Sequence, residues 1–191
     1  MARSKEFNED VVLLKAMRLF WEQGYEKTSM TELVSHMGIH KGSIYDTFGD
    51  KQSLYTQALR RYSEMLEQLA RHRLNDAQSS KDAIRLLFEM AIQRVDDNPE
   101  GCFMVNTAVE VAKMDPEAKK WVHLNWARTE HVIRELIVQG QLSGEFSKTL
   151  DAESLSYFFN NALVGLRVMV KTISDKEKLN QIMETTLAVL E

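Results

Sequence analysis

The 191-residue sequence contains only one cysteine, two prolines and eight glycines. A single cysteine excludes an intramolecular disulfide and a cysteine-based zinc cluster. Because helix breakers are so sparse, long helices are favoured, and no alternating strand-like stretch of convincing length is present. The sequence also lacks a twenty-residue apolar run, a signal peptide, an internal repeat and a low-complexity tract. We therefore expect a soluble, cytoplasmic, all-α protein.

An excess of positive charge is also missing. The formal net charge is −4, and the first 51 residues carry 7 basic against 8 acidic side chains. Nucleic-acid-binding proteins are usually basic, so the composition argues weakly against that class. A small domain can still present a local basic face, for which Arg3, Lys5, Lys41 and Lys51 are well placed.

The segment from residue 24 to residue 51 is the most informative part of the chain. Ser29 and Glu32 fit a capping box at the start of a helix, and Gly38 permits a sharp exit from it. The apolar residues between them recur at positions i, i+3, i+4 and i+7, which marks one helix face. These residues are Met30, Leu33, Val34 and Met37.

A second short helix is predicted from about Ile39 to Tyr45, with apolar anchors at Ile39, Ile44 and Phe48. Its remaining positions are small, polar or basic. A helix held from behind and open in front, placed directly after a tight turn, is typical of a helix-turn-helix motif. The second helix of this motif enters the major groove of DNA.

Further helices are predicted on both sides of this motif. Upstream, an amphipathic helix with Leu13, Ala16, Met17 and Phe20 on one face ends near Gly24. Downstream, Asp50 is a good N-cap for a helix that continues through Leu69. The later helices are expected at about 81–97, 102–113, 115–140 and 151–171, with loops at 98–101 and 141–150 and a last helix opened by a capping box of Ser174 and Glu177.

The order of these residues resembles the tetracycline-repressor family of bacterial regulators, over residues 8 to about 60. That family carries a Thr-Ser pair before its second helix, followed by a run similar to Gly-Val-Ser-Lys-Gly-Ser-Leu-Tyr-His-His-Phe and then a lysine. The matching residues here are Gly24-Tyr25, Thr28-Ser29, Gly38-Ile39-His40-Lys41-Gly42-Ser43-Ile44-Tyr45-Asp46-Thr47-Phe48 and Lys51. Two positions depart from the pattern: His40 replaces a serine that would cap better, and Asp46 replaces a histidine or tyrosine.

The resemblance implies an N-terminal three-helix DNA-binding domain, residues 1–51, and a larger helical domain, residues 52–191, for effector binding and dimerisation. We expect the last two helices, including Val164 and Leu187, to form a four-helix interface in a homodimer. We expect Thr28, Ser29, Tyr45 and Lys51 to contact DNA phosphates. Base contacts are expected from His40, Lys41, Ser43 and Thr47, with Gly42 allowing close approach.

A pocket for a small-molecule inducer is expected where methionines and large aromatic side chains gather, between Phe88 and Trp126. The alternative is that these residues are plain core. The candidate ligand-binding residues are Phe88, Ile92, Phe103, Asn106, Trp121, Trp126 and Phe159. The candidate polar anchors are Asn106, His123, Asn160, Asn161 and Arg167.

Cys102 follows Gly101 at a predicted helix start, where the helix dipole would favour the thiolate. The stretch resembles that of electrophile-responsive members of the family, in which the matching cysteine is the sensor and Lys171 matches a lysine nearby. The alternative is an inert thiol that packs a helix end.

The five histidines and the acidic residues form no metal-ligand pattern or catalytic constellation, so we expect neither an enzyme nor a cofactor. The predicted function is a dimeric transcriptional regulator that binds operator DNA. We expect a repressor released by a small apolar ligand or by thiol modification. The alternative is a helical binding or enzymatic module with an incidental helix-turn-helix.

Overall fold

A computed structural model describes residues 7–93 and 98–191 of the chain. The described residues contain helices and connecting turns and no strand, as the sequence predicts. The helices are α1 (Glu9–Gln23), α2 (Met30–Met37), α3 (Lys41–Phe48), α4 (Lys51–Leu74), α5 (Ser80–Ile92), α6 (Phe103–Glu110), α7 (Pro116–Ser143), α8 (Ala152–Met169), α9 (Lys176–Leu187) and a final 3-10 turn, η1 (Ala188–Leu190).

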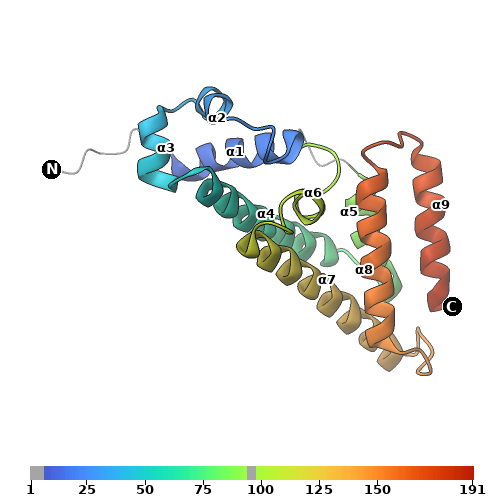
Figure 1. Ribbon diagram of the computed structural model, residues 1–191. Coiled ribbons are helices and arrows are strands. Elements are labelled where there is room, and N and C mark those ends of the chain that lie inside the picture. The colour runs from blue at the N-terminus through green and yellow to red at the C-terminus, as the bar shows by residue number, and fades with distance from the viewer. Residues whose placement is uncertain (1–6, 94–97) are drawn as a thin grey trace.

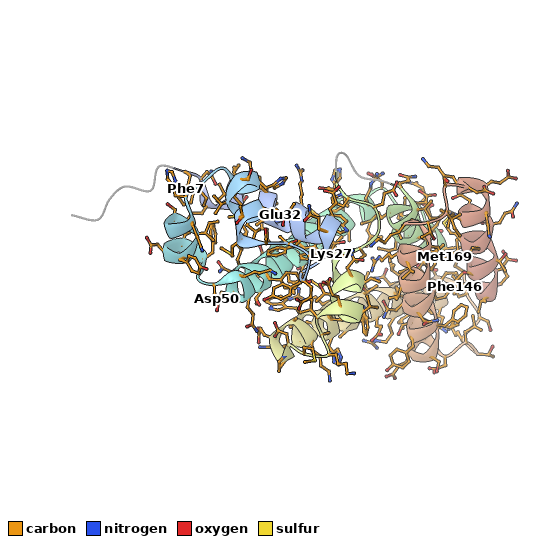
Figure 2. All side chains as sticks on the ribbon, turned by 45° about the horizontal axis from the view of Figure 1, so that its top comes forward. Phe7, Lys27, Glu32, Asp50, Phe146 and Met169 are labelled. Atoms are coloured by element: carbon orange, nitrogen blue, oxygen red, sulfur yellow. The ribbon has the colours of Figure 1, made fainter. Side chains whose placement is uncertain are left out.

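The short helices α1, α2 and α3 gather at one end of the molecule (Figure 1). From that end α4 runs into the body, where α7 lies along it, while α8 and α9 stand side by side at the opposite end. Side chains labelled at the two ends, such as Asp50 and Phe146, are correspondingly far apart (Figure 2). The long helix α4 therefore links the helix-turn-helix to the remaining helices.

The predicted caps of α2 and α4 are confirmed, whereas α3 begins at Lys41 and ends at Phe48 instead of running from Ile39 to Tyr45. Ser29 accepts a hydrogen bond from the Glu32 amide, and the Glu32 carboxylate accepts from the Ser29 amide, which completes the capping box. Gly38 adopts the left-handed conformation, with φ 73° and ψ 28°. The carboxylate of Asp50 accepts from the Ser53 amide, whereas His40 makes no side-chain cap bond at the start of α3.

Two predicted helices are shorter than expected. Helix α5 ends at Ile92 rather than continuing toward Asp97, because Gln93 already has an extended backbone; residues 94–97 lie outside the described part of the chain. Helix α6 ends at Glu110, and the backbone from Val111 to Met114 forms a turn that leads into α7.

Two predicted boundaries near the C-terminus are wrong. Helix α7 does not end at Gly140 but continues to Ser143, because the left-handed residue that terminates it is Gly144. Gly140 serves packing instead: a Cβ there would lie 2.3 Å from Cδ2 of Phe146. The predicted capping box of Ser174 and Glu177 does not form, since the carboxylate of Asp175 accepts the Lys178 amide and opens α9 one residue later.

The buried side chains form two clusters. One joins α1–α4 to α6 and the start of α7, so it crosses the predicted domain boundary after residue 51. The other joins α5, the second half of α7, α8 and α9. Leu187 belongs to this second cluster and is fully buried within its own chain, so it is not available to a dimer interface as predicted; Val164 is half-buried against the first cluster.

None of the helices in the described residues is long and apolar enough to cross a lipid bilayer.

We predict that Gly140→Ala destabilises the fold. The added methyl group overlaps the Phe146 ring, which is itself buried, and overpacking of this kind costs about 1–3 kcal/mol. The exposed neighbour Gln139 supplies the control, because Gln139→Ala should change the free energy of unfolding by less than about 0.5 kcal/mol. Urea unfolding of both variants measures the difference, and equal stability would show that the ring moves aside freely.

Candidate DNA interface and effector cavity

The helix-turn-helix is held from behind by apolar side chains. Leu33 and Met37 of α2 and Ile44 and Phe48 of α3 are buried in the first cluster. At the turn between the two helices, the ammonium of Lys15 donates to the Met37 carbonyl oxygen over 3.4 Å. This packing fixes α3 on the body while its opposite face stays open.

The open face of α3 contains most of the residues predicted to read DNA. His40, Lys41, Gly42 and Tyr45 are exposed, and Ser43 and Thr47 are half-buried. A Cβ built at Gly42 would meet nothing within 4 Å, so nothing in the described part of the chain requires glycine there. A small residue at an exposed position of this helix suits close approach by an external molecule.

Two residues predicted to contact phosphates have roles within the chain. Thr28 is fully buried, and its hydroxyl donates to the Gly24 carbonyl oxygen over 2.6 Å. It therefore stabilises the turn into α2 and does not lie on the exposed surface. Ser29 is exposed, but its hydroxyl takes part in the capping box.

Lys51 is positioned by an aromatic side chain. Its ammonium lies 4.2 Å from the ring centroid of Tyr25, a cation–π arrangement. Tyr25 packs edge-on against Tyr55 of α4 with ring centroids 4.9 Å apart. Partial burial, followed by the negative charge of nearby carboxylates, raises the pKa of Tyr25, so its ring stays neutral beside the lysine. Lys41 lies more loosely over Tyr45, at 5.9 Å.

Polar contacts tie the DNA-binding helices to α6 and α7. The carboxylate of Glu110 accepts the Glu26 amide over 2.9 Å, and it packs so closely on Gly24 that a Cβ there would lie 2.6 Å from Oε2. The amide of Gln52 donates to Asp115, the N-cap of α7. These contacts couple the position of α6 to the turn that precedes α2.

A cavity of about 540 Å³ lies where α1, α4, α5, the 98–101 loop and the α8–α9 junction meet. Its apolar wall includes Met65 and Leu66 of α4 and Ile92 of α5. Trp21 of α1 lines it, as do Arg167 and Lys171 near the end of α8. The volume falls within the range of sites for small organic molecules.

The cavity contains few of the residues predicted to bind an effector. Ile92 and Arg167 line it, as does Lys171, which was predicted only beside the possible sensor cysteine; the remaining predicted ligand-binding residues lie elsewhere. Phe88 and Phe159 pack on each other in the second cluster, and Phe103 packs between Tyr55 and Tyr62.

The two tryptophans of α7 and the other predicted polar anchors also lie outside the cavity lining. Trp121 and Trp126 pack on the first cluster, and the ring of Trp126 stacks on exposed His123. Asn160 is buried and donates to Glu130, whereas Asn161 is exposed.

Asn106 is occupied by two internal hydrogen bonds. Its amide nitrogen donates to the Trp21 carbonyl oxygen over 3.0 Å, and its oxygen accepts from the ammonium of Lys171 over 3.1 Å. Asn106 thus joins the end of α8 to α1. Trp21 was not predicted as a ligand contact. It continues the apolar face of α1 four residues after Met17, and such a position indicates core rather than a cavity wall.

Cys102 is deeply buried, with 1% of its surface exposed. Its sulfur accepts a hydrogen bond from the hydroxyl of Tyr62 over 3.3 Å. Burial, and secondarily the neighbouring thiol, raises the pKa of Tyr62 well above its usual range, so this hydroxyl remains a donor. The ammonium of Lys171 binds Asn106, and its aliphatic part covers Gly101.

Comparison with known proteins identifies the class. Residues 12–58 match the bacterial regulatory proteins of the tetR family, and residues 80–186 match the tetracyclin repressor-like C-terminal domain. The chain therefore belongs to the tetracycline-repressor family, and it is a DNA-binding transcriptional regulator rather than a helical module with an incidental helix-turn-helix.

Similar proteins cover the whole chain. The uncharacterized HTH-type transcriptional regulator YezE of Bacillus subtilis is 32% identical over 100% of both chains. The HTH-type transcriptional repressor ComR of Escherichia coli is 30% identical over 97% of this chain and 90% of its own. A structure of a cysteine mutant of the TetR-family regulator CifR with 26-base-pair operator DNA is 28% identical, has a TM-score of 0.88, and covers 99% of this chain and 100% of its own.

We predict that Lys51 contacts a DNA phosphate. Lys51→Ala should weaken binding about equally for all operator variants and lower the slope of log affinity against log salt by about one. Fluorescence anisotropy with labelled duplexes at several salt concentrations measures both quantities. Lys120→Ala, at an exposed lysine of α7, is the control and should change neither. A changed sequence preference with an unchanged salt slope would assign Lys51 to base contact instead.

Proposed function

We propose that the protein is a homodimeric repressor that binds a two-part operator through α3 and releases it when a small molecule occupies the cavity. The observation that carries the proposal is the position of that cavity. It is walled on one side by Trp21 of the DNA-binding helices and on the other by the end of α8. A molecule bound there contacts both parts of the chain. Because the protein acts on operator DNA, we propose that it works in the cytoplasm.

In this proposal the DNA-binding unit is residues 1–51 and the effector and dimerisation unit is residues 52–191. His40, Lys41, Ser43 and Thr47 read base edges, and Gly42 lets the helix approach the groove. Tyr45, Lys51 and the N-terminal end of α2 at Ser29 contact phosphates. The exposure of the front of α3 supports these roles, while the buried Thr28 supports the motif from within.

Dimerisation is proposed through an exposed apolar face of α8. Tyr157, Phe158 and Val168 are 51%, 44% and 50% exposed, although each is a large hydrophobic side chain. Gly165 lies on the same face, with open space where its Cβ would be, so a second helix could approach closely. A dimer also supplies the two recognition helices that operator half-sites one DNA turn apart require.

Val168→Glu should therefore convert the dimer into a monomer. The carboxylate would be buried without a partner in the interface, at a cost of several kcal/mol, and the monomer should lose operator binding. Analytical ultracentrifugation and operator titration measure the two effects, and circular dichroism checks the fold. Leu142→Glu is the matched control, since Leu142 is 76% exposed at the far end of α7 and should leave the dimer intact. If the Val168→Glu protein is still a dimer, the dimer interface does not include this face of α8.

The release signal is proposed to be a non-covalent ligand, because the buried sulfur of Cys102 offers an electrophile no direct approach. A ligand in the cavity would act through Lys171 and Asn106, which connect the end of α8 to the carbonyl group of Trp21. Displacing Lys171 from Asn106 would change how α1 is held on the body.

The proposal is tested with the DNA that flanks the protein's own gene. The wild-type protein should bind one duplex specifically in a gel shift, and a metabolite extract from the source cells should release it. Cys102→Ser should respond to the same extract as the wild type does. If the extract releases the DNA from the wild type but not from Cys102→Ser, and mass spectrometry detects alkylation of Cys102, the signal is modification of the thiol and not a non-covalent ligand.

A further inference from the structure

We infer that the cavity binds an organic anion, an apolar molecule with one carboxylate-like group, whose acid group pairs with Arg167 and whose oxygen also accepts from the indole of Trp21. This inference rests on the proposed effector function and names the chemical class of the effector. It follows from two polar groups that the described part of the chain leaves without partners at the same cavity.

The first group is the indole nitrogen of Trp21. Trp21 is only 6% exposed, and its buried Nε1–H has no hydrogen-bond partner among the described residues. A buried donor without an acceptor destabilises the protein, and a bound acceptor removes this penalty. The ring is fixed by an edge-to-face contact with Tyr62, whose centroid lies 4.9 Å away. Because Trp21 and Tyr62 both line the cavity, a bound molecule can supply the missing acceptor.

The second group is the guanidinium of Arg167. Within the described residues it makes no ion pair or hydrogen bond, although the residue is half-buried beside apolar side chains. An arginine in such surroundings presents a planar fork of donors that matches a carboxylate. Its neighbour Lys171 already donates to Asn106. Arg167 is therefore free to bind an acid, and among the described lining residues it is more buried than Lys176, which is exposed.

The apolar side chains that line the rest of the cavity determine what the non-acidic part of the ligand must be. Met65, Leu66, Met90 and Ile92 give the cavity an apolar and deformable surface, suited to an aromatic ring or an alkyl chain. Among the described lining residues the acid is Glu100, which is exposed to solvent, and they include the cations Arg167, Lys171 and Lys176. A small hydrophilic anion would leave this apolar wall uncovered, which favours an amphiphilic ligand.

The two groups belong to different parts of the molecule. Trp21 is on α1, packed with the helix-turn-helix, whereas Arg167 is on α8, which carries the exposed face proposed for dimerisation. A ligand that binds both fixes the distance between them. The acid would also compete with the Asn106 oxygen for the ammonium of Lys171, the group that connects α8 to α1.

The binding test uses the full-length protein without DNA and pairs of near-isosteric probes. Benzoate, 1-naphthoate, 4-phenylbutyrate and decanoate are each compared with the corresponding neutral amide by isothermal titration calorimetry. At least one carboxylate should bind, and about ten- to one-hundred-fold more tightly than its amide, the range given by a hydrogen bond to a charged group. Failure of every carboxylate to bind at millimolar concentration, or amides that bind as tightly, would overturn the inference.

Variants locate the binding site. Arg167→Gln should abolish the difference between carboxylate and amide, while Trp21→Phe should weaken both by about two- to tenfold, because both offer an oxygen acceptor. Arg60→Gln, at an exposed arginine on α4, is the matched control and should leave both affinities unchanged. Thermal unfolding without probe checks that each variant folds. An Arg167→Gln protein that folds and still prefers the carboxylate would place the anion elsewhere.

A separate measurement distinguishes this inference from the proposed function. The best-binding carboxylate is added to the complex with operator DNA, and release is followed by fluorescence anisotropy. Binding that depends on Arg167 without any release would support the ligand class and contradict its role as effector. Release by the neutral amide, unchanged in Arg167→Gln, would support effector control and contradict the anion.

Discussion

Tyr55 and Tyr62, two buried tyrosines of α4, connect the DNA-binding helices to the rest of the molecule. The ring of Tyr55 meets those of Phe20 and Phe103 edge-on, at 5.0 and 5.2 Å, and Tyr62 meets Trp21 and Phe103 in the same way. Such edge-to-face pairs contribute about 0.5–1.5 kcal/mol each beyond the burial of their area. Phe103 at the start of α6 thus contacts both tyrosines. A movement of α6 therefore displaces side chains along α4.

The hydroxyl groups of these tyrosines make the contact directional. That of Tyr55 is 2.8 Å from the hydroxyl of Thr107, and that of Tyr62 donates to Cys102. Burial raises the pKa of both tyrosines far above neutrality, which keeps both hydroxyls protonated. Thr107 lies five residues after Cys102, the N-cap of α6, which is about 1.4 helical turns, so the two bonds fix both the rotation and the height of α6 relative to α4.

The helix-turn-helix could be predicted from sequence because its signals are local. The capping box of Ser29 and Glu32, the left-handed Gly38 and the N-cap Asp50 each act within four residues, and all three are found as expected. The two boundary errors near the C-terminus have different causes: at Ser174 the adjacent Asp175 supplies the cap instead, and at Gly140 a packing contact decides. Gly140 looks like a helix terminator, but its role is to admit the ring of Phe146.

The cavity could be predicted only in part. Arg167 and Ile92 were candidates because of their chemistry, and both line it. Trp21 was not, since it lines the cavity only because the end of α1 packs against segments 41 to 158 residues further along the chain. Phe88 and Phe159 were predicted to bind the ligand because they are large and aromatic. They are instead packed in the hydrophobic core and do not line the cavity.

The contact between Gly24 and Glu110 has a consequence for protein engineering. The carboxylate of Glu110 occupies the space that any side chain at position 24 would need, and it accepts the Glu26 amide just beyond. The two residues lie in different halves of the chain yet pack directly against each other. A chimaeric regulator that combines this headpiece with another sensory domain will keep this contact only if the new domain places a hydrogen-bond acceptor at the position of Glu110.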